Sequence, residues 1–325
     1  MRGTARLERW PLRETFGIAR GVSTESHVLH VQLTHADIVA QGEAEAAEYT
    51  EEQARERLRA CEDFLAQMPE DYTRLRLQQD LPAGPVRNAI DCAFWDFEAK
   101  QRGIRAWEIA GIEQGRVRTL YTIGLDTPEV MGTRAAAHAD WPWLKVKLGG
   151  GPGDRERIAA VRRAAPRAQL LVDANGGWTL DELNAYAPEL AALGVSVIEQ
   201  PLAPGADTAL AGWRGPLPLC ADESCIDRSS LATLPDGYGY INIKLDKTGG
   251  LTEALALAAA AHTRGLRVMV GCNLGTSLAT APALLVARLA DIVDLDSPLL
   301  LARDREPALV YDHDLIEWPE IRLWG

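Results

Sequence analysis

The chain has 325 residues, and its 34 lysines and arginines against 46 aspartates and glutamates give a net charge of −12 at pH 7. A single compact core is usually built from a shorter chain, so we expect two domains, or one large barrel with an appended unit. The negative charge gives no general attraction to phosphate groups, so we expect neither nucleic acid nor an anionic membrane as a partner.

The first residues and the cysteines bear on location. The first twenty residues carry several charges and no apolar run, so we expect neither a signal peptide nor a membrane-spanning helix, and we expect a cytoplasmic protein. The five cysteines are scattered and form no Cys-x-x-Cys pair, which argues against a disulfide framework and against a structural zinc site.

Residues 1–110 are typical of an α+β domain. Segment 7–18 and the alternating segment 28–33 predict two strands with a connecting loop. A capping-box pattern at its start predicts a charged amphipathic helix over about 50–65, and a second helix is expected over about 85–101.

After about Arg118, short apolar segments alternate with alanine-rich helical segments. Eight strands are expected, at residues 120–125, 144–148, 170–173, 195–199, 217–222, 240–245, 268–272 and 292–295. Apolar strands joined by helices indicate a parallel sheet buried on both faces, and eight of them favour closure into a barrel. We therefore expect an α/β fold with a barrel domain in residues 111–308, and a segment 309–325 that returns as a strand onto the first domain.

Charged residues end most of the expected barrel strands, where such barrels place their active sites. These residues are Lys147, Asp173, Glu199, Asp222, Lys244, Asp294 and Asp296. The acids Asp173, Glu199 and Asp222 follow one another at intervals of about one strand–helix unit, so they converge on neighbouring strands. Three close carboxylates repel one another unless a cation neutralises them, and Mg²⁺ prefers such oxygen ligands. We expect a magnesium site; the alternative is a set of acids paired with nearby lysines.

Three lysines are expected to face the same rim. Lys145 and Lys147 lie two positions apart on one strand, so both point into the barrel, and Lys244 ends a strand across from them. Burial, a metal and a second ammonium each lower the pKa of a lysine and make it a better base. We interpret Lys147 and Lys244 as opposed bases on the two faces of one substrate carbon; solvated or ion-paired lysines are the alternative.

Five motifs follow one another along these strands: Lys145-Val-Lys147, Asp173-Ala-Asn175, Glu199-Gln-Pro201, Asp222-Glu-Ser224 and Lys244. In this order they resemble the enolase superfamily, and within it the muconate-lactonizing-enzyme subgroup. The resemblance covers nearly the whole chain. It implies a modified TIM barrel of the (β/α)7β type with an N-terminal α+β capping domain.

The resemblance also implies the chemistry. The family removes a proton α to a carboxylate and stabilises the resulting enediolate with a metal, which here would be one Mg²⁺ per subunit on the three strand-end acids. Lys147 and Lys244 would be the bases, and Lys145 would contact the substrate carboxylate and lower its neighbour's pKa. Family members are often homo-oligomers, so a homo-oligomer is one expectation.

A motif on the last strand nominates the substrate. Asp294-Leu-Asp296 resembles the Asp-x-Asp with which dipeptide epimerases of this subgroup bind the substrate's α-amino group. Two carboxylates on one side of a strand end suit an ammonium and repel purely anionic substrates. An acidic strand terminus with no substrate role is the alternative.

Other residues are expected to touch the substrate. Arg20 lies in a segment that resembles the mobile loop closing over substrate, and it is a candidate partner for a side-chain carboxylate. Thr122 resembles a substrate-contacting threonine of the family. Asn175 lies beside the metal ligands, and Ser277 lies in a small-residue segment after the seventh strand that leaves room for substrate.

We therefore expect a Mg²⁺-dependent dipeptide epimerase that inverts the α-carbon of the C-terminal residue, with L-Ala-D/L-Glu or a near relative as its small-molecule substrate. An o-succinylbenzoate synthase or an N-acylamino-acid racemase would share the lysines and the metal without needing the paired aspartates. A barrel that binds a metal or a ligand without catalysis is the alternative from another class.

Overall fold

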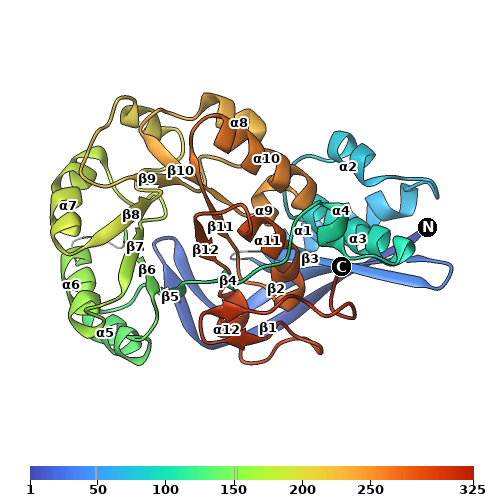
Figure 1. Cartoon of the computed structure of the whole chain (residues 1–325), viewed down its shortest axis with the longest axis horizontal. Coiled ribbons are helices and arrows are strands. Elements are labelled where there is room, and N and C mark those ends of the chain that lie inside the picture. The colour runs from blue at the N-terminus through green and yellow to red at the C-terminus, as the bar shows by residue number, and fades with distance from the viewer. Residues whose placement is uncertain (48–49, 150, 152) are drawn as a thin grey trace.

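The computed structural model describes residues 1–47, 50–149, 151 and 153–325. In these residues, a three-stranded antiparallel sheet with its helices lies against an eight-stranded parallel sheet that curls into a barrel, as Figure 1 shows. This arrangement confirms the expected α/β fold with a barrel and a separate N-terminal α+β unit.

The N-terminal sheet contains β1, β2 and β3 in that order. Their bounds are Arg2–Ile18, Gly21–His35 and Ile38–Ala47. The two expected strands are confirmed, whereas β3 lies outside the prediction because its alanines and glycine have low strand propensity. Small residues are required there by close packing on a helix, since a Cβ added at Gly42 would lie 2.2 Å from the Ala89 carbonyl oxygen.

Four helices belong to this part of the described chain. They are α1 (Glu51–Gln67), α2 (Arg74–Asp80), α3 (Pro85–Arg102) and α4 (Ala106–Ile109). The two expected helices, α1 and α3, are confirmed. The Thr50 hydroxyl accepts a hydrogen bond from Gln53 N at 3.3 Å, and α3 ends where Gly103 takes the left-handed conformation with φ 65°.

The barrel sheet has eight parallel strands among the described residues. They are β5 (Tyr121–Ile123), β6 (Trp143–Lys147), β7 (Gln169–Asp173), β8 (Val195–Glu199), β9 (Leu219–Ala221), β10 (Tyr238–Ile243), β11 (Arg267–Gly271) and β12 (Ile292–Asp294). Each lies where the sequence predicts a strand. Leu120 N donates to Val293 O at 2.9 Å, and this hydrogen bond bridges the first and last strands of the barrel.

Helices connect the barrel strands. They are α5 (Pro128–Ala137), α6 (Asp154–Ala164), α7 (Leu180–Ala192), α8 (Arg228–Thr233), α9 (Leu245–Thr248), α10 (Leu251–Thr263) and α11 (Ser277–Ala287), and α12 (Ser297–Leu300) follows the last strand. Between β8 and β9 the chain forms only a 3-10 helix, η1 (Ala206–Leu210), because Pro201, Pro204 and Pro216 interrupt helix formation there. Among the described residues, no helix has the length and apolar character that crossing a membrane requires.

Side chains alternate inward and outward along each barrel strand, and the inward ones form layers. The lower layer is apolar and contains Leu120, Leu171, Val197, Cys220, Tyr240, Met269 and Ile292. Two positions further along these strands stand Thr122, Asp173, Glu199, Asp222, Asn242, Gly271 and Asp294. An apolar plug therefore supports a polar layer at the carboxyl ends of the strands.

The C-terminal segment differs from its expected course. β13 (Tyr311–Asp312) and β14 (Leu315–Ile316) form a small sheet with β4 (Val117–Arg118), which precedes the barrel, and they do not pair with the first domain's sheet. The last residues do contact the first domain: Trp324 Nε1 donates to Cys92 O at 2.9 Å, and Gly325 N donates to Asp96 Oδ1 at 2.8 Å.

The N-terminal domain is fixed to the carboxyl ends of the barrel strands. Leu125 N, just after β5, donates to Gly17 O at 2.8 Å near the end of β1. The buried carboxylate of Glu43, on β3, accepts from both Thr276 N and Thr276 Oγ1 at the start of α11. The first contact holds the end of β1 at the carboxyl end of β5, and the second holds β3 at the start of α11. Figure 1 shows the β1–β2 hairpin reaching toward β5.

Candidate active site

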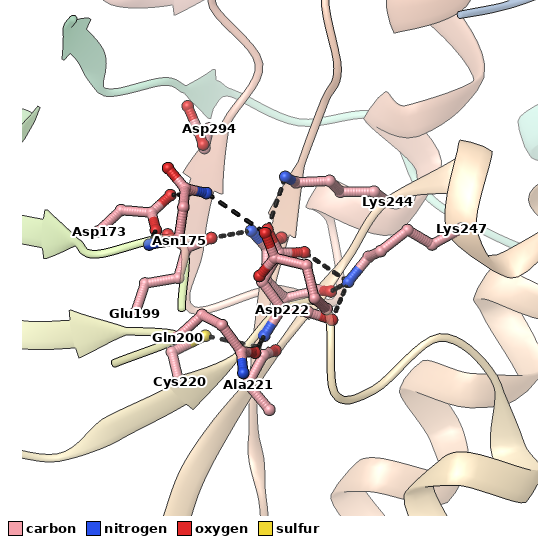
Figure 2. Close-up of polar contacts among 12 residues, drawn as sticks. Asp173, Asn175, Glu199, Gln200, Cys220, Ala221, Asp222, Lys244, Lys247 and Asp294 are labelled. Carbon is pink, nitrogen blue, oxygen red and sulfur yellow. Dashed lines mark hydrogen bonds and ion pairs between the residues drawn. The ribbon is translucent and has the colours of Figure 1, made fainter. Parts of the chain in front are cut away.

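Three acids converge at the carboxyl ends of neighbouring strands. Asp173 ends β7, Glu199 ends β8, and Asp222 follows β9. One carboxylate oxygen from each lies within 4.8 Å of the other two, and all three side chains are buried. The sequence places these residues one strand apart, and the parallel sheet brings them to one point, as Figure 2 shows.

The charges around these acids are unequal. Burial and the nearby Asp173 carboxylate raise the pKa of Glu199 to about 7, although Lys145 opposes the shift. Burial would raise the pKa of Asp173 as well, but the ammonium groups of Lys147 and Lys145 lower it to about 2. Lys145 thus does not offset the burial of Glu199 beside Asp173, and the donors offered by the three acids are all carboxylate oxygens. This donor set fits a hard divalent cation such as Mg²⁺.

Lys145 and Lys147 point into the barrel from β6. Lys145 Nζ lies 2.7 Å from Glu199 Oε2 and 2.8 Å from Asp294 Oδ2, so it bridges acids of two distant strands. Lys147 Nζ lies 2.6 Å from Asp173 Oδ2. Burial would lower the pKa of Lys145, but the Asp294 and Glu199 carboxylates hold it well above its usual value.

Lys244 reaches the same centre from the other side of the barrel. It follows β10, and its Nζ lies 2.7 Å from Asp222 Oδ2. Burial would lower the pKa of Lys244, but the Asp222 carboxylate holds it above its usual value. The alternative of acids paired with lysines therefore describes these contacts, although Lys145 leaves the unfavourable burial of Glu199 beside Asp173 only partly offset.

A pocket opens above this centre. Its lining includes the three lysines of the barrel and, from the β1–β2 hairpin, Phe16, Ile18, Arg20 and Ser23. Since Lys147 and Lys244 line it from β6 and from the end of β10, a molecule in the pocket lies between two amines. Both domains therefore build one site.

Asp294 and Asp296 line the same pocket. Thr122 N donates to Asp296 Oδ2 at 2.6 Å, and Thr122 Oγ1 donates to Asp294 Oδ1 at 3.4 Å, so Thr122 orients both carboxylates. Burial and the neighbouring Asp294 raise the pKa of Asp296 to about 7. A cationic group placed beside this pair would relieve the unfavourable charge.

Arg20 and Asn175 also line the pocket. Arg20 Nη1 lies 2.6 Å from Glu223 Oε1 and donates to Asn175 O at 3.3 Å, which joins the hairpin to the barrel rim. Asn175 has a positive φ of 44° and turns back so that its backbone N donates to Asp173 Oδ1 at 2.8 Å. Its side chain also accepts from Lys147 Nζ at 3.3 Å.

Ser277 does not reach the pocket, so its expected substrate contact was wrong. It begins α11 and is fully buried. Its backbone N and its hydroxyl both donate to the Asp304 carboxylate, and the hydroxyl also accepts from Leu309 N at 2.8 Å. These bonds hold Ser277 on the far side of the helix start, where it fixes the C-terminal segment.

The structure adds residues that sequence reasoning missed. Asn242 Nδ2 donates to Glu199 Oε1 at 2.7 Å, and Gln200 Oε1 accepts from Asp222 N at 2.8 Å. Lys247 Nζ lies 2.5 Å from Asp222 Oδ1. Strand alternation would have found Asn242, which lies two positions before Lys244 and so faces the same way. No such periodicity identifies Lys247, because it lies beyond the strand on a short helix.

Residues 131–315 match the family described as enolase C-terminal domain-like. The L-Ala-D/L-Glu epimerase of Escherichia coli (strain K12) is 42% identical over 307 residues, which cover 94% of this chain and 95% of that protein. The N-acetyl-D-glutamate racemase of a Pseudoalteromonas species is 43% identical over 249 residues, covering 75% of this chain and 78% of that protein.

Solved structures of dipeptide epimerases and their relatives are also similar to this chain. A crystal structure of an enolase family member from Agrobacterium tumefaciens with homology to dipeptide epimerases, with bound sodium and L-Ala-L-Glu, has a TM-score of 0.95 at 42% identity and covers 99% of each chain. The dipeptide epimerase of Methylococcus capsulatus, in complex with Mg and L-Arg-D-Lys, has a TM-score of 0.85 at 28% identity and covers 98% of this chain and 96% of that one. The chain belongs to the enolase superfamily, in the muconate-lactonizing-enzyme subgroup that contains the dipeptide epimerases.

Proposed function

We propose that this protein is a Mg²⁺-dependent dipeptide epimerase that inverts the α-carbon of the C-terminal residue, with L-Ala-D/L-Glu as the favoured substrate. One observation carries the proposal: Lys147 and Lys244 line a single pocket from opposite sides, directly above three buried acids and beside a pair of aspartates. The identity to an L-Ala-D/L-Glu epimerase and the likeness to a structure holding L-Ala-L-Glu support this substrate.

The acids and lysines at the bottom of the pocket would perform the proton transfer. A divalent cation held by Asp173, Glu199 and Asp222 would neutralise the charge that develops on the substrate carboxylate as its α-proton leaves. One lysine, Lys147 or Lys244, removes the α-proton from one face, and the other returns a proton to the opposite face. Proton transfer of this kind needs no redox cofactor.

The ion pairs control when a lysine acts as a base. The Asp222 carboxylate holds Lys244 as an ammonium, so Lys244 acts as a base only after its ion pair with Asp222 is broken and its pKa falls. Lys145 lies between Glu199 and Asp294, where its ammonium can contact the substrate carboxylate and keep positive charge next to Lys147.

The pocket walls would hold the two ends of the dipeptide. Asp294 and Asp296 would bind the free α-ammonium, because an ammonium restores charge balance where burial has raised the pKa of Asp296 to about 7. Arg20 would pair with the carboxylate of a glutamate side chain. Thr122 and Asn175 would orient the aspartates and Lys147 around the bound substrate.

A second candidate is racemisation of an N-acylated amino acid such as N-acetylglutamate, favoured by the 43% identity to a racemase of that class. The two candidates differ at the substrate nitrogen, which is a cation in a dipeptide and a neutral amide in an N-acyl amino acid. The paired carboxylates lining the pocket favour the cation.

The test is α-proton exchange followed by NMR in D₂O with MgCl₂. L-Ala-L-Glu and N-acetyl-L-glutamate are incubated separately with the protein, with and without a chelator. The proposal expects Mg²⁺-dependent deuteration and inversion of the dipeptide's glutamate, at a much higher kcat/KM than for N-acetylglutamate. Faster turnover of N-acetylglutamate would establish the second candidate, and absence of exchange in both would favour a non-catalytic barrel.

We also propose a cytoplasmic location for this enzyme. All five cysteines carry free thiols, and four of them are buried, which suits a reducing compartment such as the cytoplasm. Assembly into a homo-oligomer stays a prediction, which a sedimentation measurement of the purified protein would settle.

A further inference from the structure

Lys247 makes an unusual set of contacts next to the proposed metal site. It lies on α9, one helical turn after Lys244, and its side chain is 14% exposed. Its Nζ lies 2.5 Å from Asp222 Oδ1 and donates to Asn242 O at 2.9 Å and Cys225 O at 3.2 Å. It also donates to the backbone carbonyl of Asp222, so a single ammonium contacts both the side chain and the main chain of one acid.

These contacts divide the two oxygens of Asp222 between two lysines. Oδ2 contacts Lys244, which lines the pocket, whereas Oδ1 contacts Lys247, which is outside the pocket lining. Figure 2 shows both amines, from Lys244 and from Lys247, directed at the carboxylate of Asp222. Lys247 therefore has no path to a bound substrate, and its contacts bear on Asp222 and its surroundings.

The backbone contacts extend this role to the loop. The carbonyl oxygens of Asp222 and Cys225 belong to the turn after β9, and that of Asn242 belongs to β10. By bonding all three, Lys247 ties the turn that carries Asp222 to the strand that leads to Lys244. Gln200 completes the hold, because its Oε1 accepts from Asp222 N at 2.8 Å.

We propose that Lys247 is a positioning residue that fixes the carboxylate of Asp222 for metal binding. The inference rests on the proposed function, since it needs a cation at Asp173, Glu199 and Asp222. Two effects of Lys247 have opposite signs. Its positive charge repels a cation, so removal would tighten binding, whereas loss of the fixed geometry would weaken binding. We infer that the loss of fixed geometry outweighs the loss of repulsion, because the four contacts of Lys247 hold Asp222 and its turn in place before a metal binds.

The test measures Mg²⁺ binding without substrate. Wild-type protein and the Lys247→Met variant are titrated with MgCl₂ by calorimetry, and the melting temperature of each is recorded with and without the metal. The inference expects Lys247→Met to bind Mg²⁺ about 10- to 100-fold more weakly. The rise in melting temperature on adding Mg²⁺ should shrink in proportion. Equal or tighter binding by the variant would overturn the inference.

Two further variants complete the design. Lys100→Met is the matched control, because Lys100 Nζ also contacts a buried carboxylate, Asp96 at 2.7 Å, and a carbonyl, Val39 O at 2.9 Å, but in the other domain. It should leave Mg²⁺ affinity unchanged. If Lys247→Met does not fold, Lys247→Gln decides by sign: weaker Mg²⁺ binding supports positioning, and equal or tighter binding overturns it. Failure of the wild type to bind Mg²⁺ would instead reject the proposed function, and the inference with it.

Discussion

The acids and lysines at the bottom of the pocket lie on barrel strands or directly after them, whereas Arg20, in its wall, lies in the turn of a hairpin from the other domain. The bottom residues are buried and joined by ion pairs, and an apolar layer supports them. Arg20 is more exposed and touches the barrel through Glu223 and Asn175. This difference suits a site in which rigid strands carry the shared chemistry and a loop selects the substrate.

The largest loss is expected from removing a base at the bottom of the pocket. Lys147→Ala and Lys244→Ala should each reduce epimerisation of L-Ala-L-Glu by about 10³-fold or more, because each proton transfer needs its own amine. The measurement is the inversion rate by polarimetry at saturating Mg²⁺. Lys100→Met serves as a control that removes a lysine elsewhere. Epimerisation near the wild-type rate in either variant would contradict the two-base assignment.

A smaller loss of activity is expected from changing Asp296, in the wall of the pocket. Asp296→Asn keeps the shape of the side chain but removes one charge next to the substrate ammonium. A hydrogen bond to a charged group contributes about 1.5–3 kcal/mol, so kcat/KM for L-Ala-L-Glu should fall by about 10- to 150-fold. Turnover of N-acetyl-L-glutamate should fall much less. An equal loss for both substrates would show that Asp296 does not recognise the ammonium.

A change at Arg20 in the hairpin should affect only substrates that carry a side-chain carboxylate. Arg20→Met should lower kcat/KM for L-Ala-L-Glu by about 5-fold, because a partly exposed charge pair contributes up to about 1 kcal/mol. It should leave L-Ala-L-Met almost unchanged, since that side chain has no carboxylate. The measurement is the ratio of the two kcat/KM values. A uniform loss would mean that Arg20 closes the hairpin and does not select the side chain.

The smallest effect on activity is expected from Asp91, on α3 and away from the pocket. Burial raises its pKa to about 6. The unfolded chain has an Asp pKa of about 3.9, so the folded state binds more protons between the two values, and stability falls as pH rises from about 4 to about 6. Asp91→Asn should remove this loss, on the order of 3 kcal/mol. Urea unfolding at several pH values measures it, and an unchanged pH slope would refute the assignment.

Much of the fold and of the site follows from strand alternation. The apolar runs end in charged residues, so Asp173, Glu199 and Lys244 identify both the strand ends and the polar layer. The same rule would have included Asn242. The sequence did not predict β3, because close packing against α3 requires small residues there and small residues have low strand propensity. Tertiary contact overrides local propensity there.

Residues beyond the strand ends were harder to place. Ser277 lies close to pocket residues in the sequence, yet the start of α11 turns it toward Asp304. Lys247 reaches Asp222 only because α9 folds back on the strand end. Such contacts depend on the direction that a helix takes after the strand end, which neither periodicity nor residue type predicts. Strand periodicity therefore predicts the strand-borne part of the site, whereas Arg20, in the hairpin turn, was expected only from the family resemblance.

The most direct test of opposed bases follows α-proton exchange separately from L-Ala-L-Glu and L-Ala-D-Glu in D₂O with MgCl₂. The wild type should deuterate both. Lys147→Ala should lose exchange of one epimer and Lys244→Ala that of the other, because each amine faces one side of the α-carbon. Loss of exchange from the same epimer in both variants, or full exchange of both epimers in either variant, would contradict the account.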